Sequence, residues 1–343
     1  MIDQPRAERI AGLHPAYFSM VMATGIVSVA SQLLAYRAVA VAMFALNAII
    51  YLALWVLTVV RIAKYRPRVV ADLHHHGRAV GFFTIVAATC VLGTQCVVIA
   101  GMWRTAAALW ILGIGLWALL TYSIFTILII KQEKPTLAEG MNGGWLVSVV
   151  AAQSVAVLGV QLAQGFGLYE QRILFFCLAM WLGGGMLYIW IISLIFYRYT
   201  FFPMNPADLA PPYWVNMGAV AISALAGSLL VLAADRSPLL IGLLPFARGL
   251  TLLFWATATW WIPMLVILGF WRHVYRRFPL RYDPLYWGAV FPLGMYTVSS
   301  FRLAQAMDVP YLLFIPRGFL VVSWLAWTAA MMAFVTSSLR ARG

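Results

Sequence analysis

One pattern recurs five times along this sequence: an aromatic residue opens an apolar stretch, and a small residue follows it seven positions later. The aromatic residues are Phe18, Phe83, Trp145, Trp214 and Trp287, and the small residues are Gly25, Cys90, Ala152, Ala221 and Gly294. A second apolar stretch follows each copy before the next copy begins. Such a pattern is typical of a repeated helical hairpin. If the five hairpins close into a ring, the small residues leave room for a passage between the helices.

Composition places these hairpins in a membrane. Of the 343 residues, 64% are hydrophobic and only 10% are charged, which is more apolar surface than a soluble domain of this size can bury. A bilayer core about 30 Å thick is crossed by roughly 20 apolar residues in a helix. The sequence predicts ten such spans within a single transmembrane domain of residues 1–343: 15–35, 38–62, 79–101, 105–130, 142–165, 172–198, 212–234, 244–275, 285–305 and 312–338.

The predicted spans alternate in length, because the odd-numbered spans are short and the even-numbered spans are several residues longer. A longer span must tilt or extend beyond the bilayer. We therefore expect an all-α membrane protein with a quasi-five-fold arrangement. Five short helices form an inner ring around a central pore, and five longer helices surround them.

The basic residues predict the orientation of the chain. If the loops alternate between the two sides, sixteen of the 23 Lys and Arg residues lie on the side of the N-terminus and seven on the other. This distribution follows the positive-inside bias and predicts a multi-pass protein of the cytoplasmic membrane with both termini in the cytoplasm. The net charge of +13 then reflects topology and contact with acidic lipid headgroups rather than binding to nucleic acid.

Acidic residues are absent from the middle of every predicted span. All ten Asp and Glu residues, Asp3 among them, fall near span ends or in loops, whereas proton relays and cation pathways keep carboxylates at membrane depth. The three cysteines have no metal-ligand spacing, and the five histidines lie at or beyond the cytoplasmic span ends. The sequence therefore favours passage of small anions over an enzyme, and it predicts neither a metal nor a cofactor.

The ninth span contains the most specific local motif, YWGAVFPLGMYTVSS at 286–300. Pro292 lacks a backbone N–H and tends to kink a helix. Phe291 stands three residues before Gly294 and so shares its helical face. The equivalent residues in the other copies are Met22, Ala87, Val149 and Gly218. A single bulky ring at this level predicts a gate formed by Phe291 and Pro292, and the alternative is ordinary packing of an aromatic side chain.

Polar residues on the short helices are candidates for contact with an anion, because a neutral donor in apolar surroundings stabilises an anion without holding it tightly. The most central candidates are Thr24, Thr89, Gln153 and Asn216. The alternative for each is hydrogen bonding between helices. Arg302, near the end of the ninth span, is the best charged candidate, and its alternative is a structural pairing with Asp308 or with a helix end.

Five further arginines lie near the start of the even-numbered spans, one in each hairpin: Arg37, Arg104, Arg172, Arg248 and Arg317. They are interpreted either as residues that snorkel at the membrane interface or as a positive collar that raises the local concentration of anions.

Two segments resemble one known family. HPAYFSMVMATGIVS at 14–28 and YWGAVFPLGMYT at 286–297 are similar to the tellurite-resistance/dicarboxylate transporter family, which includes plant slow-type anion channels, malate permeases and fungal sulfite exporters. The resemblance implies a homotrimer in which the five odd-numbered helices of each subunit form a separate pore. It also implies that Phe291 occludes this pore. Channel members of the family resemble each other in having prolines within most inner helices, whereas here only the ninth span has a proline well inside it.

The sequence thus predicts transport of a small anion, either a C4-dicarboxylate such as malate or an oxyanion such as sulfite or tellurite, through a pore gated by Phe291. An anion-selective channel, rather than a coupled carrier, is the alternative. A membrane-embedded enzyme and a structural or sensory protein with a vestigial pore are the less favoured classes.

Overall fold

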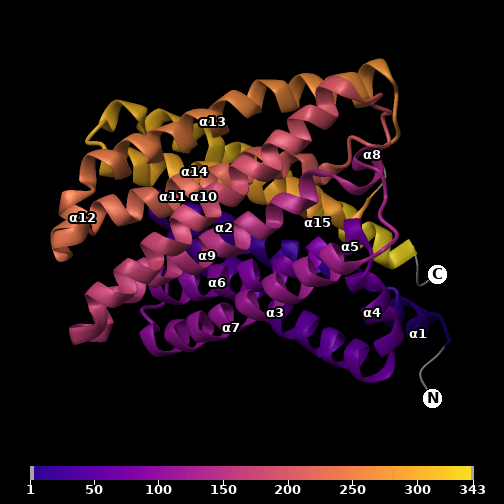
Figure 1. Ribbon diagram of the computed structural model, residues 1–343, viewed down its shortest axis with the longest axis horizontal. Helices are drawn as coiled ribbons and strands as arrows, with labels where there is room; N and C mark the ends of the chain where they lie inside the picture. The colour runs from indigo at the N-terminus through magenta and orange to yellow at the C-terminus, as the bar shows by residue number, and fades with distance from the viewer. Residues whose placement is uncertain (1–3, 281, 341–343) are drawn as a thin grey trace.

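The computed structural model describes residues 4–280 and 282–340, and these residues form helices and loops without strands. An all-α fold is therefore confirmed. Asp3, Arg281 and Arg342, which the sequence counts of charged residues include, lie outside the described residues. The helix α1 (Gln4–Ala11) and the C-terminal end of the last helix lie at the same end of the bundle (Figure 1). We call this end the termini side and the opposite end the far side.

Five short helices form the inner layer: α2 (Ser19–Leu33), α6 (Phe83–Val98), α9 (Val147–Leu162), α11 (Val215–Leu232) and α14 (Trp287–Ala306). A short 3₁₀ turn leads into each one: η1 (Pro15–Phe18), η2 (Val80–Phe82), η3 (Gly143–Leu146), η5 (Pro211–Trp214) and η8 (Pro284–Tyr286). Nearly every residue of these helices is buried. A helix that is apolar all round and buried on all sides belongs in the interior of a fold.

The inner helices close into a ring. In chain order α2 packs against α6, α6 against α9, α9 against α11, and α11 against α14. The ring is completed by contact of α14 with α2. The five-fold arrangement expected from the repeated pattern is therefore present.

Five longer helices cover the ring: α3 (Arg37–Lys64), α7 (Trp103–Ile130), α10 (Glu170–Phe201), α13 (Leu244–Phe270) and α15 (Phe314–Arg340). Large apolar side chains on them are widely exposed, for example Ile49 at 65% and Ile129 at 69%. An exposed apolar belt of this extent is the surface that a lipid bilayer covers.

By length and hydropathy, eight segments of the described residues qualify as membrane spans. One of these segments joins α9 with α10, and α14 is not among them. The count of ten spans stays a prediction.

Each outer helix is hydrogen-bonded to the inner helix of the following hairpin. We call these contacts the inter-repeat hydrogen bonds. They join the Tyr51 hydroxyl to Thr89 (3.0 Å), Trp110 Nε1 to the Val155 carbonyl (2.9 Å), Trp181 Nε1 to the Ser223 carbonyl (2.8 Å), Trp255 Nε1 to Ser300 (2.9 Å) and Trp327 Nε1 to Thr24 (2.9 Å). The last of them links α15 to α2, so the polar contacts form a circle as the inner helices do.

Short helices on the termini side, α4 (Arg66–Leu73), α5 (His76–Ala79) and α8 (Leu137–Gly140), connect the hairpins. Asp72 of α4 forms ion pairs with Arg78 of α5 at 2.5 Å and with Arg61 of α3 at 2.6 Å. Burial opposes ionisation of Asp72, but the hydrogen bonds from these arginines outweigh it and lower its pKa. The end of α3 is thereby held against the loop that leads to the second hairpin.

On the far side the connections are η4 (Ala163–Tyr169), η6 (Ala234–Arg236), α12 (Pro238–Gly242) and η9 (Pro310–Leu313), and η7 (Trp271–Tyr275) continues α13 toward the termini side. The acidic residues of the described chain lie in the connecting segments of both sides or near helix ends, as the sequence predicts. Glu170 at the start of α10 pairs with Arg236 at 3.0 Å.

Candidate functional site

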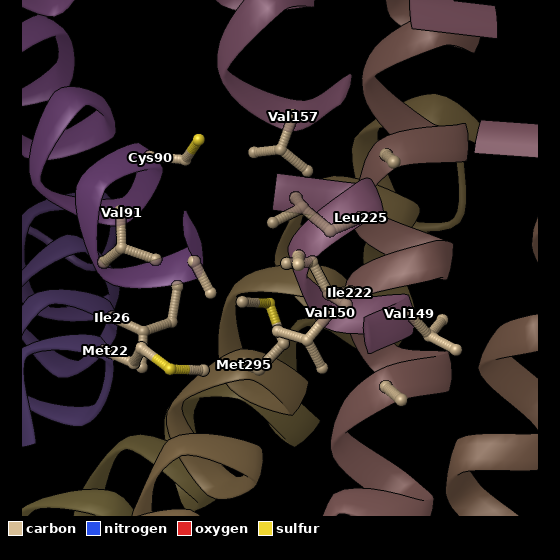
Figure 2. Close-up of a cluster of buried hydrophobic side chains, with 14 of the residues drawn as sticks. Met22, Ile26, Cys90, Val91, Val149, Val150, Val157, Ile222, Leu225 and Met295 are labelled. Atoms are coloured by element: carbon tan, nitrogen blue, oxygen red, sulfur yellow. The ribbon is translucent and has the colours of Figure 1, made fainter. Parts of the chain in front are cut away.

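One face of each inner helix points toward a common axis. A narrow cavity on the far side is lined by residues at i, i+3 and i+7 of every inner helix. They are Ile26, Val29 and Leu33 of α2, Val91, Thr94 and Val98 of α6, Ser154, Val157 and Gln161 of α9, Ile222, Leu225 and Leu229 of α11, and Met295, Val298 and Arg302 of α14. This spacing is one face of a helix. Figure 2 shows Ile26, Val91, Val157, Leu225 and Met295 converging from their separate helices.

We call this space the far cavity. Its volume is about 20 Å³, which is room for a single water molecule. Its wall is almost wholly apolar, with Thr94, Ser154, Gln161 and Arg302 as the polar exceptions. None of its lining residues is a carboxylate. The far cavity is therefore narrow in this structure and free of negative charge.

A second, wider cavity opens on the termini side, and we call it the vestibule. It has a volume of about 480 Å³ and is lined by the first turns of the inner helices, with Ser19, Thr84, Val147, Val215 and Gly288 at equivalent positions. Polar and charged groups from the connecting segments and from the end of α10 complete its wall: His14, Glu139, Asn142, Asp208 and, on α10, Arg198. Unlike the far cavity, the vestibule is wide enough for several water molecules or a small solute.

Arg198 is buried in the vestibule wall and is held there by three kinds of contact. It donates from Nε to the Ala138 carbonyl at 2.8 Å and from Nη1 to the Tyr213 hydroxyl at 2.8 Å. Asp208 lies 3.8 Å from Nη2. These contacts fix the guanidinium, so its positive charge is a permanent part of the vestibule.

His14 lines the vestibule at the entrance to the first inner helix. Its Nδ1 accepts a hydrogen bond from the Ala16 N–H at 3.1 Å and caps η1. Burial, assisted by the charge of Arg78, lowers the pKa of His14 to about 4. The imidazole is therefore neutral at physiological pH, as its role as an acceptor requires.

Phe291 lies between the residues of α14 that line the two cavities. Phe291 stands three residues after Gly288, which lines the vestibule, and four before Met295, which lines the far cavity. These spacings place Phe291 on the same face of α14 as both. The ring is 1% exposed and lines neither cavity. Phe291 thus occupies the level of α14 at which the vestibule and the far cavity are separated.

The third hairpin is shifted by one residue relative to the sequence alignment of the copies. Because the turn η3 ends at Leu146 and the lining residues of α9 follow from it, the residue equivalent to Phe291 is Val150 rather than Val149. Figure 2 shows Val150 among the converging side chains and Val149 pointing away from them. The anchor position of this copy is correspondingly Leu146. Trp145 instead donates from Nε1 to the Gly140 carbonyl at 2.8 Å.

Pro292 packs directly against the backbone of the neighbouring inner helix α11 at Gly218. A Cβ atom added at Gly218 of α11 would lie 2.7 Å from Pro292 Cγ and 3.2 Å from its Cα. Only glycine permits this approach, because real Cβ atoms do not come so close to carbon. The contact fixes the position of α14 at the level of Phe291.

Four of the five small residues of the repeated pattern do not line the far cavity, although the sequence predicts that they face the pore. Cys90 alone among them lines the far cavity. A Cβ at Gly25 would meet Val91 at 2.5 Å and Asn47 at 2.8 Å, and a Cβ at Gly294 would meet Ile26 at 2.8 Å. Ala152 and Ala221 are buried and line neither cavity. The axis is instead lined by the following position in four copies and, in the third copy, by Ser154, two positions after Ala152. The two glycines let inner helices approach their neighbours.

The four neutral polar candidates are each hydrogen-bonded to an outer helix. Thr24 accepts from Trp327, Thr89 bonds Tyr51 at 3.0 Å, Gln153 donates to the Trp181 carbonyl at 3.0 Å, and Asn216 donates to the Tyr199 hydroxyl at 3.1 Å. None of the four lines either cavity. The structure therefore places them in contacts between helices and gives their predicted contact with an anion no support.

Arg302 differs from these candidates because it lines the far cavity. Its Nη1 donates to Gln305 Oε1 at 2.9 Å, and the guanidinium carbon lies 5.9 Å from the centre of the Phe301 ring. The four ion pairs of the described residues do not include Arg302, so no pairing with Asp308 is present. The contact with Gln305 instead ties Arg302 to the end of α14.

Three polar lining residues were missed by sequence reasoning: Thr94, Ser154 and Gln161. The signal that finds them is the i, i+3, i+7 spacing, which begins eight positions after the anchor residue of every copy once Leu146 replaces Trp145 as the anchor of the third. In the third copy Trp145 lies one residue before the anchor position, so an alignment on the aromatic residue shifts the predicted lining positions by one.

Comparison with known proteins assigns the chain to a family. Residues 12–335 match the family model described as SLAC1, voltage-dependent anion channel. The chain belongs to this family. The resemblance found in the two sequence motifs is thereby confirmed, and the family is one of channels and transporters.

The relatives of this chain include both uncharacterized and named proteins. An uncharacterized membrane protein of Mycobacterium tuberculosis is 42% identical over 149 residues, which are 43% of this chain and 75% of that protein. An uncharacterized transporter of Methanocaldococcus jannaschii is 24% identical over 96% of this chain and 94% of its own length. The sulfite efflux pump SSU1 of Trichophyton rubrum is 25% identical over 96% of this chain and 92% of its own length.

Proposed function

We propose that the protein moves small anions across the membrane along the axis of the inner ring and that Phe291 closes this path. The observation that carries the proposal is the pair of cavities on one axis, which are separated at the level of Phe291. An anion crossing the ring meets Arg198 beside the carboxylates of Glu139 and Asp208 in the vestibule, and then Arg302 in the far cavity, whose lining contains no carboxylate. Membership of an anion-channel family supports the same activity.

We propose sulfite as the first anion to test, because three relatives that match most of this chain are named sulfite efflux pumps. Malate and tellurite belong in the same panel on the strength of the family resemblance. The proposed arrangement is a homotrimer with one conduit in each subunit and the vestibule facing the cytoplasm. The excess of basic residues on the termini side supports this orientation.

The decisive test is the flux of sulfite into liposomes that contain purified protein with Phe291→Ala. If the ring contributes only about 1.4 kcal/mol to the barrier, its removal raises flux about tenfold. Phe254→Ala is the matched control, because Phe254 is an equally buried ring that packs against Trp181 away from both cavities. Equal flux through the wild type and Phe291→Ala, with both proteins folded and inserted, would refute the gate.

The same liposomes separate a channel from a coupled carrier. Flux that continues along the anion gradient without a pH gradient indicates a channel. Flux that requires a pH gradient, or that drives protons with the anion, indicates a coupled carrier.

A further inference from the structure

We propose that Arg302 and Gln161 form an anion-binding site at the far end of the conduit, and that this site selects small oxyanions over halides. The inference rests on the proposed function, because it assigns the step at which an anion enters or leaves the same path. It is carried by the position of Arg302 in the cavity wall and by the absence of a carboxylate partner among the described residues.

The two residues belong to the same level of the ring. Their level is the last one lined by every inner helix, and its five members are Leu33, Val98, Gln161, Leu229 and Arg302. Leu33 and Val98 are the final residues of α2 and α6, and Gln161 is the penultimate residue of α9. An anion at this level therefore sits at the mouth of the conduit and does not need to enter its apolar interior.

Arg302 retains most of its capacity to donate hydrogen bonds. A guanidinium has five N–H donors, and among the described residues one of them is used, toward the neutral side chain of Gln305. The residue is half-buried and borders an apolar wall. A charged group in such surroundings is costly unless an opposite charge accompanies it. A bound anion supplies that charge.

Other arginines of the far side do not share these features. Arg37, Arg104, Arg172, Arg248 and Arg317 are exposed and do not line either cavity. Arg236 is paired with Glu170. Arg302 is thus the arginine that the fold directs toward the axis at this end.

The chemistry of the guanidinium defines the class of ligand. Its planar fork binds two oxygens of one oxyanion through parallel hydrogen bonds, whereas a spherical halide receives no such bidentate contact. Gln161 of α9 lies at the same level, and its Nε2 donates one N–H to the Val157 carbonyl at 3.0 Å, which leaves the second N–H of the amide for an anion. A compact oxyanion such as sulfite or nitrate satisfies this geometry better than chloride does.

The test measures binding and transport separately, with sulfite and chloride as probes. In thermal unfolding of the purified protein, sulfite stabilises the wild type more than chloride does, because a ligand that binds the folded state raises its stability. In liposomes, Arg302→Gln raises the half-saturating concentration of sulfite about tenfold, since a hydrogen-bonded charge is lost. Arg302→Lys keeps the charge but loses the preference for sulfite over chloride.

Arg317→Gln is the matched control, because it removes an exposed arginine from the same side and leaves both half-saturation and stabilisation unchanged. Wild-type values for Arg302→Gln would overturn the proposal. If that variant does not fold, unchanged half-saturation in both Arg302→Lys and Gln161→Leu overturns it. If no protein supports flux, the proposed function fails, while the stabilisation by sulfite and its loss in Arg302→Lys still decide the binding site.

Discussion

Substitution of Gly218 by alanine tests how α14 is positioned at the gate. The new Cβ would lie 2.7 Å from Pro292 Cγ, 3.0 Å from its Cβ and 3.2 Å from its Cα, whereas carbon atoms prefer a separation of about 3.5–4.0 Å. The proline ring and its backbone are stiff, so α14 must move away from α11 by about 1 Å. Overpacking of this kind costs about 1–3 kcal/mol.

The matched substitution is Gly183→Ala on α10. A Cβ at Gly183 meets no atom within 4 Å, so this variant gains the helix propensity of alanine, about 1 kcal/mol, without a clash. Gly218→Ala gains the same propensity and loses the packing. We therefore expect Gly218→Ala to unfold about 1–3 kcal/mol more readily than Gly183→Ala.

Thermal unfolding in detergent, with intrinsic fluorescence as the signal, compares the two variants directly. Anion flux through Gly218→Ala in liposomes should also differ from the wild type, because the displacement of α14 carries Phe291 with it. If both variants have the same unfolding temperature, or Gly218→Ala has the higher one, the close contact between α11 and Pro292 does not hold the gate helix in place.

Two further predictions concern the ring and the vestibule. Trp327→Phe removes the hydrogen bond to Thr24 and should lower stability by about 1 kcal/mol; unfolding at the wild-type temperature would show that this inter-repeat hydrogen bond contributes nothing. The pKa of His14 is about 4 in the folded state and 6.5 ordinarily, so the unfolded state binds the proton more tightly and stability falls as pH drops from 6.5 toward 4, by up to about 3 kcal/mol. His14→Asn keeps an acceptor for the η1 cap and should flatten this dependence in unfolding measured across that pH range, whereas an unchanged pH profile would mean that other groups cause it.

The architecture of the ring was predictable from the sequence because the repeated pattern is long and the alternation of span lengths is regular. Inner helices buried on all sides and outer helices exposed to lipid follow from that alternation, and the structure contains both layers. Family membership was also predictable, since the motifs around 14–28 and 286–297 are specific.

Which face of each inner helix points toward the axis was harder to predict. A helix that is apolar all round has no polar face to mark its orientation, and adjacent positions differ by about 100° around the axis. Gly25 was expected at the axis, but its neighbour Ile26 lines the cavity. The same ambiguity made Thr24 a candidate for anion contact, although it accepts a hydrogen bond from Trp327 behind the wall.

Arg302 could be singled out because charge is rare at membrane depth, but its partner could not. Sequence proximity favoured Asp308 as a structural counterion, and the two residues lie on either side of the end of α14. The structure pairs Arg302 with the neutral Gln305 instead. Which residues share its level depends on the packing of α9 and α14, which are far apart in the chain.

The link between α15 and α2 has a consequence for biosynthesis. Trp324 donates to Ser31 at 3.0 Å and Trp327 donates to Thr24 at 2.9 Å, so the first hairpin obtains these donors only from the final one. During translation, the hydroxyl of Thr24 therefore lacks its Trp327 donor until α15 has been inserted. A chain that stops after four hairpins leaves the inner ring open. The ring closes when α14 packs against α2, and α15 then supplies the two hydrogen-bond donors to α2.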